Sequence, residues 1–335
     1  MSKKRTLDGF FKPAQSKKPK LGTDTESASI PEDTLPRDAS NHPTYPYPVP
    51  HFPTSITDAL AFAPATEGRA INDQPDLDLV YFEPYIPKEV HKELFKFLRQ
   101  ELFFYRVQYT IKRGAAETSI STPRYTTVFG VDASSYFSPT GVLLDAESQR
   151  PIPKDRYTCH PRPLPQCLDA LRILTEGSTD STYNFCLVNY YASGADSISY
   201  HSDDERFLGP NPSIASFSLG AKRDFYMKHK PFPPAKNPSD PPPPETRQIK
   251  LALASGDMVL MRGSTQANWL HSIPKRKGGE SERGRINITF RKAMVRGGTE
   301  NYYRYNVGVG GVFGWDEGRG EMVPWEGGAK KGEKG

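Results

Sequence analysis

The sequence predicts an α+β protein that is mainly β, a two-sheet sandwich or jelly roll with helical buttresses near its N-terminal side. Helical periodicity is confined to the first part of the globular region, in residues 87–102 and 164–174. Beyond residue 182, short runs of β-branched and aromatic residues alternate with Gly, Pro or Asp turns. These runs are YNFCLVNYY, SIASFSLG, RDFYMKHK, QIKLALASGDMVLMRG and GRINITFRK.

The individual elements follow from local patterns. Residues 87–102 begin with Pro and carry apolar side chains at amphipathic-helix spacing, namely Val90, Leu94, Phe97, Leu98 and Leu102. A second helix is predicted over LPQCLDALRIL. The Gly-Asp turn within residues 248–263 suits a β-hairpin.

Three regions are expected to lie outside the folded domain or to interrupt it. Residues 1–75 are rich in Pro, Ser, Thr and Asp, and we expect disorder because they cannot bury enough apolar surface. The domain is predicted to span residues 76–296. Within it, residues 231–244 (PFPPAKNPSDPPPP) predict an extended surface insertion. Residues 297–335 are Gly-rich and are predicted to form a loosely attached tail.

Composition excludes several classes of protein. Cys159, Cys167 and Cys186 form no Cys-x-x-Cys pair, so neither a disulfide framework nor a thiolate zinc cluster is expected. No apolar run reaches the roughly 18 residues of a membrane span, so a membrane partner is not expected. The first 21 residues hold seven Lys or Arg against one Asp, while the 335-residue chain carries only +5. The remainder is therefore near neutral, and net charge alone does not make it a polyanion binder.

The stretch ISYHSDDERF suggests a metal site. His201 and Asp203 alternate along an extended segment, so their side chains point to the same face, and His271 follows later in NWLHSIPK. Two imidazoles and one carboxylate form the facial triad typical of non-haem Fe(II), although zinc uses the same ligands. The alternative is a pair of solvated loop residues.

The run GRINITFRK suggests an anion site. Arg285, Asn287, Thr289 and Arg291 alternate with Ile286, Ile288 and Phe290, which gives the strand one polar face. Arg makes bidentate, charge-assisted bonds to carboxylates, so two Arg on one face suit a dicarboxylate. Beside a metal triad, 2-oxoglutarate is the obvious candidate. The alternative is an exposed strand face that carries its charge in solvent.

These motifs, in their order along the chain, resemble those of the AlkB family of Fe(II)/2-oxoglutarate dioxygenases. The resemblance covers residues 78–292 and is strongest from Tyr183 onward, in NFCLVNYYASGADSISYHSDDERFLGPNPSIASFSLGAKRDFYMKHK, NWLHSIPKR and RINITFRK. It is closest to the nuclear branch that repairs alkylated DNA. The resemblance implies a double-stranded β-helix, and Fe(II), 2-oxoglutarate and O2 as reactants. It also implies oxidative demethylation of bases such as 1-methyladenine and 3-methylcytosine, with release of formaldehyde, CO2 and succinate.

The resemblance assigns roles residue by residue. His201, Asp203 and His271 match the iron ligands. Arg285 matches the Arg that binds the distal carboxylate of 2-oxoglutarate, and Arg291 the Arg near its iron-chelating end. The polar residues that complete the cosubstrate site are matched by Asn189, Tyr191 and Asn287.

Substrate contacts are also implied. Asp204 and Glu205 match acidic residues near the damaged base, with Glu205 expected at its exocyclic amine; the alternative is a solvated turn. Candidates to stack on a flipped base are Tyr125, Tyr136 and Phe137, although aromatics in a sheet domain are more often core. The loop KRK at residues 275–277 is expected to contact the DNA backbone through Lys275, Arg276 and Lys277.

Residues 106–130 match the family's base-flipping finger loop. Tyr109 or Ile111 is expected to fill the gap left by a flipped base, although a core position for Tyr109 is equally compatible. The segment is longer than the family's tight hairpin, and the expected bulky aromatic falls at or next to Thr110. This departure leaves open whether the substrate is duplex DNA, single-stranded DNA or RNA.

The N-terminus carries one motif typical of partner binding and one typical of nuclear import. In KRTLDGFFKP, Leu7, Phe10 and Phe11 resemble the motif that docks into the replication sliding clamp, with Lys4 where the strict motif has Gln. The adjacent SKKPKL is similar to a nuclear import signal, which predicts a nuclear protein. Three functions are weighed: a monomeric DNA demethylase, the same chemistry on RNA or single-stranded DNA, and an inactive clamp-tethered binding module.

Overall fold

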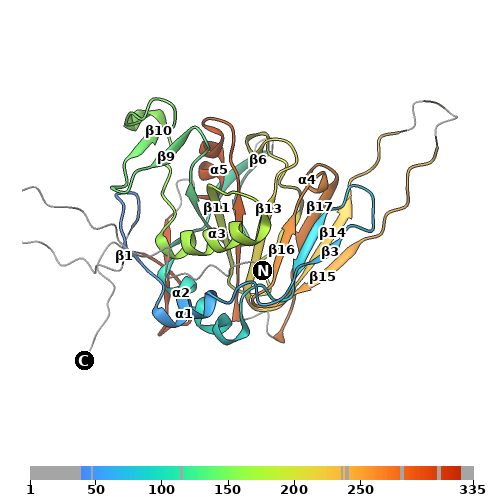
Figure 1. Cartoon of the computed structure of the whole chain (residues 1–335), viewed down its shortest axis with the longest axis horizontal. Coiled ribbons are helices and arrows are strands. Elements are labelled where there is room, and N and C mark those ends of the chain that lie inside the picture. The colour runs from blue at the N-terminus through green and yellow to red at the C-terminus, as the bar shows by residue number, and fades with distance from the viewer. Residues whose placement is uncertain are drawn as a thin grey trace, which may run out of the picture.

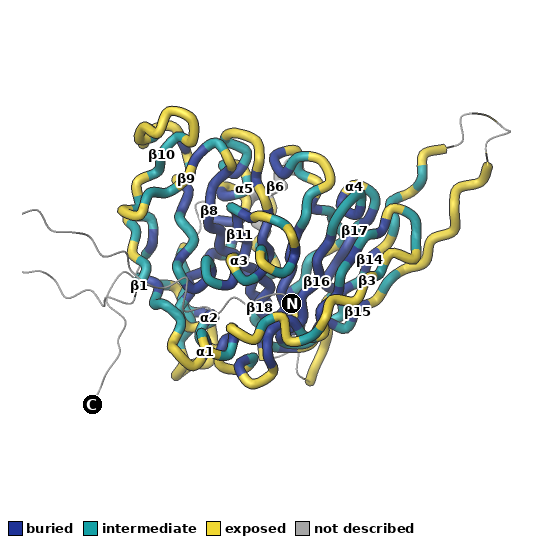
Figure 2. Tube along the Cα trace, viewed as in Figure 1, coloured by how far each residue is buried: buried dark blue, intermediate teal, exposed yellow. Residues whose placement is uncertain are grey.

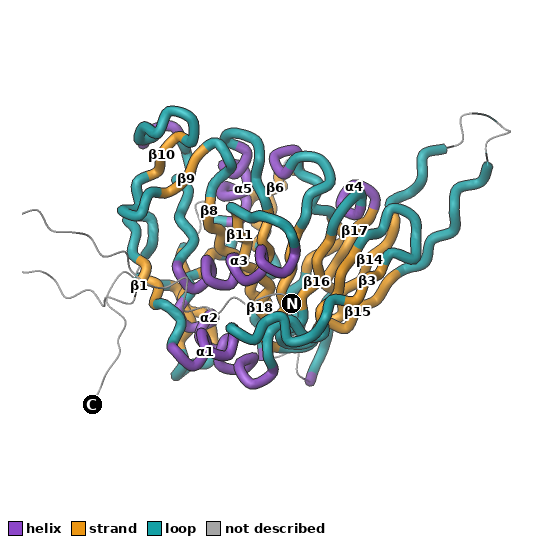
Figure 3. Tube along the Cα trace, in the orientation of Figure 1, coloured by secondary structure: helices purple, strands orange, loops and turns teal. Residues whose placement is uncertain are grey.

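Two antiparallel sheets, one of ten strands and one of four, form the centre of the molecule, with α1, α2 and α3 lying outside them (Figure 1). The structure is a computed structural model, and it describes residues 39–46, 48–113, 116–234, 237, 241–279, 283–307 and 311–325. Strands dominate the ordered elements (Figure 3), and the buried residues concentrate in central strands such as β8, β11 and β16 (Figure 2). The predicted mainly-β jelly roll with helical buttresses is confirmed.

The major sheet runs in the order β20-β19-β5-β8-β11-β18-β13-β16-β4-β3. Every residue of its central strands β11 and β18 is buried, as expected for β-branched and aromatic runs covered on both faces. The strands are β3 (Arg69–Ile71), β4 (Leu79–Phe82), β5 (Phe104–Tyr105), β8 (Tyr125–Gly130), β11 (Phe185–Tyr191), β13 (Ile214–Gly220), β16 (Met258–Met261), β18 (Arg285–Arg291), β19 (Val312–Asp316) and β20 (Glu321–Pro324).

The minor sheet runs in the order β12-β17-β14-β15, with β12 (Ile198–His201), β14 (Arg223–His229), β15 (Ile249–Leu253) and β17 (Trp269–Ile273). The hairpin predicted within residues 248–263 is wrong, because β15 pairs with β14 whereas β16 pairs with β13 and β4 in the other sheet. Tertiary bonds fix this turn: the Asp257 carboxylate accepts the Tyr81 hydroxyl at 2.6 Å and the Ala254 N–H at 2.8 Å. The turn therefore carries the chain from one sheet to the other.

Helices buttress the sheets where periodicity predicted them. α2 (His91–Glu101) follows η2 (Lys88–Val90), buries Leu94, Phe95 and Leu98, and packs against β13 and β19. α3 (Gln166–Thr179) is confirmed but ends later than its apolar pattern suggests. The remaining helical elements are α1 (Thr54–Leu60), η3 (Lys154–Arg156), η4 (Arg206–Leu208), α4 (Thr265–Asn268) and α5 (Gly298–Asn306). No helix in the described residues is long and apolar enough to cross a membrane.

The N-terminal region is ordered over more of its length than its composition suggests. Residues 39–75 contain β1 (Ala39–Ser40), β2 (Val49–Pro50), α1 and β3, so disorder is the wrong expectation for them. The apolar side chains between the prolines join the core: Val49 and Ile56 are fully buried, and Tyr45 donates its hydroxyl to the Pro163 carbonyl. Residues 1–38, with the clamp-like and import-like motifs, lie outside the described residues.

Two small hairpins and the proline insertion complete the fold. β6 (Gln108–Arg113) pairs with β7 (Ala116–Ser121), and β9 (Ser135–Phe137) pairs with β10 (Leu143–Asp145). The described residues of the insertion 231–244 belong to no helix or strand and lie between β14 and β15. In the finger region β6 and β7 pair in a register that sets Arg113 opposite Ala116. This pairing shows that β6 and β7 are adjacent antiparallel strands, while the comparison of the segment's length with the family's hairpin and the place of its aromatic stay predictions.

The described residues of the predicted tail, 297–307 and 311–325, are part of the fold, so a loosely attached tail is the wrong expectation for them. In this region helix α5 buries Thr299, Tyr303 and Asn306, and strand β19 pairs with β5 and β20. The Arg99 guanidinium of α2 lies 3.6 Å from the centre of the Trp315 ring on β19. Gly-rich composition concealed this attachment, because the residues that dock are a few aromatics spaced between glycines.

Candidate metal centre and cosubstrate pocket

Two histidines meet across the minor sheet. β12 ends at His201 and pairs with β17 in a register that sets His201 opposite His271. Side chains of directly opposed residues share one face of a sheet. The two imidazole rings accordingly lie with centroids 4.2 Å apart. The His201 Nδ1 lies 2.9 Å from the Ser199 carbonyl, which leaves Nε2 to face the centre.

Asp203 supplies a carboxylate to the same point. Its Oδ1 lies 3.8 Å from His201 Nε2, and its Oδ2 lies 3.6 Å from His271 Nε2. The Asp203 backbone N–H donates to Gln266 Oε1 at 2.9 Å, which fixes the turn after β12. Burial favours a raised pKa for Asp203, but Arg291 and the two imidazoles outweigh it and lower the pKa, so the carboxylate is ionised.

The three side chains fit a divalent metal. Their ligand atoms all lie within 4.8 Å of one another, and His271 Nδ1 is buried without a hydrogen-bond partner. Burial lowers the pKa of His271 to about 3, so its imidazole is neutral, the form that ligates metals. Residues in the described part of the chain therefore could hold Fe(II) in a facial triad with open positions, as predicted.

The polar face of β18 is buried and faces the same space. Arg285, Asn287, Thr289 and Arg291 are each at most 9% exposed, so a charged face in solvent is the wrong alternative. Arg285 donates to Ser218 Oγ at 2.7 Å, and Asn287 donates to Ser216 Oγ at 2.9 Å. β18 is a central strand between β11 and β13, and its polar side chains line a cavity that residues of the minor sheet also line, which keeps them from bulk water.

Both guanidiniums keep unused donors. Arg285 Nε and Nη1 and Arg291 Nε are buried without a hydrogen-bond partner, although Arg291 Nη2 lies 3.2 Å from Asp203 Oδ2. Burial lowers the pKa of Arg285 to about 10, and Tyr191, whose ring centre lies 5.4 Å from its guanidinium carbon, opposes that shift. A buried cation with free donors is costly unless an anion completes it. The arrangement thus suits two carboxylates, one at each Arg.

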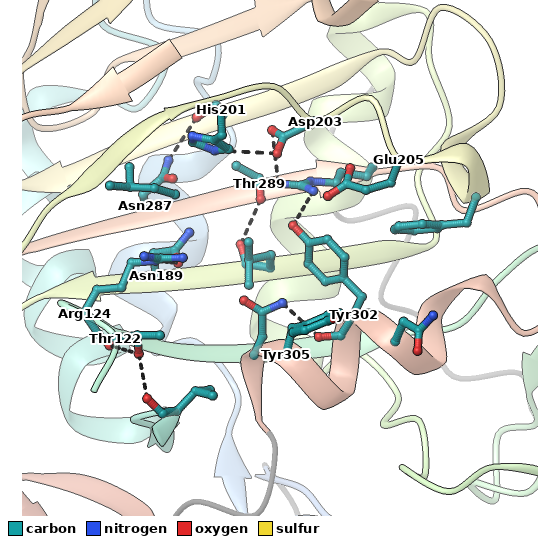
Figure 4. A pocket seen from close by; sticks show the side chains of 18 of the residues that line it. Thr122, Arg124, Asn189, His201, Asp203, Glu205, Asn287, Thr289, Tyr302 and Tyr305 are labelled. Atoms are coloured by element: carbon teal, nitrogen blue, oxygen red, sulfur yellow. Dashed lines mark hydrogen bonds and ion pairs between the residues drawn. The ribbon is translucent and has the colours of Figure 1, made fainter. Parts of the chain in front are cut away.

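The triad and the Arg pair line one cavity of about 1580 Å³ between the two sheets. Ligand pockets of about 300–1,000 Å³ hold a typical small molecule, so this one has room for a cosubstrate and part of a second reactant. Figure 4 shows His201 and Asp203 on one side of the cavity and Tyr302 and Tyr305 on the other. The predicted cosubstrate residues Asn189, Tyr191 and Asn287 also line it.

The two acidic residues after Asp203 point in different directions. Glu205 lines the cavity, its Oε2 is buried without a partner, and burial raises its pKa. Asp204 lies outside the cavity lining, exposed and paired with Lys230 Nζ at 2.7 Å. The expectation that Asp204 faces the substrate is therefore wrong, because alternation in the extended turn sends it outward between two inward-facing carboxylates.

The predicted stacking aromatics do not reach the cavity. Tyr125 is buried in the core of β8, where its ring lies 5.2 Å from that of Phe313 and 6.2 Å from that of Tyr190. Tyr136 and Phe137 lie on β9 and line a separate, smaller cavity. Tyr125 therefore belongs to the core, as the alternative interpretation predicted. Because none of the three aromatics lines the cavity, the expectation that they stack on a base beside His201 is wrong.

Other predicted contacts lie on the surface or outside the described side chains. Lys275, Arg276 and Lys277 are exposed in the loop after β17, away from the cavity lining. Tyr109 and Ile111 lie on β6, and their side chains are outside the described part of the structure. Leu7, Phe10 and Phe11 fall outside it altogether.

Two residues that sequence reasoning missed belong to this site. Arg124, just before β8, donates from Nε to Asn189 Oδ1 at 3.1 Å and lines the cavity. Tyr302, from α5, accepts a hydrogen bond from Arg291 Nη1 at 2.5 Å. A signal for α5 existed in the buried positions 299, 303 and 306, which follow helical spacing, but the Gly-rich surroundings masked it.

Comparison with known proteins agrees with this geometry. The family model described as "2OG-Fe(II) oxygenase superfamily" matches residues 78–291. The Homo sapiens protein named "DNA oxidative demethylase ALKBH2" is 40% identical over 138 residues, which cover 41% of this chain and 50% of that protein. The Mus musculus "Alpha-ketoglutarate-dependent dioxygenase alkB homolog 3" is 41% identical over 143 residues, 42% of this chain and 48% of that protein.

A plant relative gives the same picture. The Arabidopsis thaliana "DNA oxidative demethylase ALKBH2" is 38% identical over 142 residues, which cover 39% of this chain and 44% of that protein. The chain thus spans about half the length of the curated relatives that it matches. The resemblance to AlkB proteins that the motifs indicated is confirmed by these matches. The family model covers well over half of the chain, and the chain belongs to the 2OG-Fe(II) oxygenase superfamily.

Proposed function

We propose that this protein is an Fe(II)/2-oxoglutarate-dependent dioxygenase that removes N-alkyl groups from DNA bases such as 1-methyladenine and 3-methylcytosine. One observation carries the proposal: a metal triad and two partly unsatisfied guanidiniums line the same buried cavity. The similarity to proteins named DNA oxidative demethylases supports the choice of substrate. The products are formaldehyde, CO2, succinate and the repaired base.

The chain's own residues hold the reactants in place. His201, Asp203 and His271 would hold Fe(II), which supplies the chemistry for oxidation by O2 when 2-oxoglutarate is bound. Arg285, at one end of the polar face of β18, binds the distal carboxylate. Arg291, beside Asp203, binds near the metal-chelating end. Fixing both ends of the cosubstrate removes rotational freedom before any bond is broken, which lowers the barrier to reaction.

Glu205 is the proposed contact for the base. Its buried Oε2 has no partner and lies in the same cavity, so an exocyclic amine of an alkylated base would satisfy it. The methyl group on a Watson–Crick edge is inaccessible in a duplex, so the base must leave the stack before it enters. The paired strands β6 and β7 are the proposed wedge, with Tyr109 or Ile111 at the gap.

The remaining proposals concern the setting of the reaction. Lys275, Arg276 and Lys277 are proposed to contact the DNA backbone, because exposed cations on one loop add salt-dependent affinity. Leu7, Phe10 and Phe11 are proposed to bind the sliding clamp, and the neighbouring basic run to direct the protein to the nucleus. We propose that the protein acts there as a monomer.

Demethylation of defined oligonucleotides tests the proposal. The purified chain is incubated with Fe(II), 2-oxoglutarate and a 1-methyladenine oligonucleotide, single-stranded or duplex, and mass spectrometry follows the loss of the methyl group. His201→Ala should abolish the reaction, whereas His160→Ala should leave it unchanged because His160 is exposed and does not line the cavity.

The outcomes separate the three functions weighed. Methyl loss that requires 2-oxoglutarate and His201 supports the proposal, and the ratio of duplex to single-strand rates identifies the preferred form. If 2-oxoglutarate is consumed while neither DNA is demethylated, the DNA assignment is wrong and methylated RNA becomes the substrate to try. If 2-oxoglutarate is neither bound nor consumed, the proposed enzyme activity is refuted.

A further inference from the structure

The C-terminal helix α5 lies outside the matched family domain yet lines the active-site cavity. The family match ends at residue 291, and α5 spans Gly298–Asn306. Asn301, Tyr302, Arg304, Tyr305 and Asn306 of this helix all face the cavity that holds the metal triad. Part of the cavity wall therefore comes from residues beyond the family match.

Tyr302 connects this wall to the cosubstrate site. Its hydroxyl accepts a hydrogen bond from Arg291 Nη1 at 2.5 Å, and the Arg291 guanidinium carbon lies 5.1 Å from the centre of its ring. Arg291 in turn places Nη2 3.2 Å from Asp203 Oδ2. The Arg291 guanidinium is thus held between a proposed metal ligand, Asp203, and a residue of α5, Tyr302; Figure 4 labels both of these residues.

The Tyr302 ring is itself fixed by its neighbours. It lies edge-on to Phe185 at 5.3 Å and to Phe207 at 5.5 Å between ring centroids. A side chain locked by packing holds its hydrogen-bond partner in one orientation. With Nη1 bound to Tyr302 and Nη2 close to Asp203, the Arg291 guanidinium is held in one orientation. Its Nε is buried and has no hydrogen-bond partner.

We propose that Tyr302 is a positioning residue for Arg291, so that α5 completes the binding site for the metal-chelating end of 2-oxoglutarate. This role rests on the proposed function. Loss of the hydroxyl leaves the charge of Arg291 intact but frees the guanidinium to rotate. The cosubstrate then binds more weakly, while the reaction of the bound complex changes little.

The neighbouring residue offers a matched control. Tyr303 lies on the same helix and is buried, but its hydroxyl donates to the Gly130 carbonyl at 2.7 Å and accepts the Arg162 N–H at 2.9 Å, away from Arg291. Tyr302→Phe and Tyr303→Phe each remove one buried hydroxyl from α5. A general loss of stability affects both variants, whereas a loss of Arg291 orientation affects only Tyr302→Phe.

The test titrates 2-oxoglutarate into the Mn(II)-loaded full-length chain and measures its Kd by calorimetry, with melting curves for every variant. Because Tyr302→Phe removes a hydrogen bond to a charged group, we expect the Kd for 2-oxoglutarate to rise about tenfold. For Tyr303→Phe the Kd should stay within about twofold of wild type. KM for 2-oxoglutarate should rise with Kd while kcat is nearly unchanged.

Two results would overturn the inference. An unchanged Kd for Tyr302→Phe means that Arg291 needs no help from α5, and equal losses in both variants mean that the helix acts only through stability. If the wild-type chain binds no 2-oxoglutarate at all, the proposed function is refuted first and the role of Tyr302 with it.

A different side chain of α5 both lines the cavity and is exposed to solvent. Tyr305 is 74% exposed, an unusual position for a large aromatic, and it lines the cavity together with the exposed Val295. The other aromatics of the lining, Tyr191, Phe207, Phe225 and Tyr302, are buried or half-buried. We infer that Tyr305 is a stacking surface for a base of the substrate, a part that Tyr125, Tyr136 and Phe137 do not fill.

Binding of a fluorescent 1-methyladenine oligonucleotide to the full-length chain, followed by anisotropy, tests this role. Loss of one stacked base predicts a Kd about fivefold or more higher for Tyr305→Ala, with recovery in Tyr305→Trp and no change in the Kd for 2-oxoglutarate. Tyr136→Ala is the control, because Tyr136 is also exposed but lies on β9 outside this cavity. Equal affinity of Tyr305→Ala and wild type would refute it.

Discussion

Asp203 serves as a counterion as well as a proposed metal ligand, and this makes a prediction for the metal-free protein. Asp203 and Arg291 are 3% and 2% exposed, and they lie 3.2 Å apart. Asp203→Asn keeps the size of the side chain and removes its charge. The change therefore leaves Arg291 buried beside a neutral amide, without opening a cavity.

The magnitude follows from burial. Removing one partner of a buried ion pair costs about 3–5 kcal/mol. Arg291 keeps its hydrogen bond to Tyr302, so we expect a loss near the lower end, about 3 kcal/mol. For a domain of this size each kcal/mol lowers Tm by roughly 2–4 °C, so Tm should fall by about 6–12 °C.

The next residue in the chain provides the control. Asp204 pairs with Lys230 at 2.7 Å, but its side chain is half exposed. Exposed pairs contribute about 0–1 kcal/mol, so Asp204→Asn should lower Tm by a few degrees at most. Thermal and urea unfolding in EDTA at neutral pH, which removes any metal, compare the two variants with wild type. Equal unfolding of Asp203→Asn and Asp204→Asn would refute the claim that Asp203 balances Arg291.

Three further predictions concern metal, cosubstrate and thiols. Mn(II) at about 100 times its Kd should stabilise the wild-type chain by about 2.7 kcal/mol and leave His271→Ala unaffected in a thermal shift assay; a shift in both would exclude His271 as a ligand. Arg285→Lys should raise the Kd for 2-oxoglutarate about tenfold or more in calorimetry, because Lys keeps the charge but not the bidentate fork, and an unchanged Kd would contradict that role. Iodoacetamide at pH 8 should label the half-exposed Cys159 and spare Cys167 and Cys186 when digested peptides are analysed by mass spectrometry, because burial raises the pKa of Cys167 to about 12 and that of Cys186 still further, which keeps both thiols protonated; labelling of all three would show that the core opens.

Local alternation along the chain is why the shared face of His201 and Asp203 and the polar face of β18 could be predicted from the sequence. In β18 every second residue is polar, and because these residues line the cavity shared with the minor sheet, the pattern becomes a buried polar face. His201 and Asp203 share a face for the same reason. The same alternation explains why the Asp204 side chain points away from the cavity. An acidic run in the sequence does not by itself show which of its residues face inward.

Such local patterns do not determine which strands and helices pack against each other. A Gly-Asp turn at residues 256–257 is compatible with a hairpin or with a crossing between sheets, and only the bonds to Asp257 from Tyr81 and Ala254 decide. An aromatic such as Tyr125 is compatible with the core or with a ligand, and the central position of β8 decides for the core. The docking of α5 likewise depends on partners far away in the chain.

Arg291 contacts residues from segments that are far apart in the chain. The minor sheet contributes the imidazoles and, just after β12, Asp203; the major sheet contributes Arg291; and the C-terminal region contributes Tyr302. Each contact of Arg291 satisfies part of a buried charge that none of the three elements could hold alone. Order at the metal centre should therefore depend on the docking of α5. A variant that weakens the C-terminal attachment far from the cavity, such as Trp315→Ala at the Arg99 contact, should raise the Kd for 2-oxoglutarate in calorimetry through Arg291. Lys92→Ala, an exposed change on the same helix as Arg99, should leave that Kd unchanged.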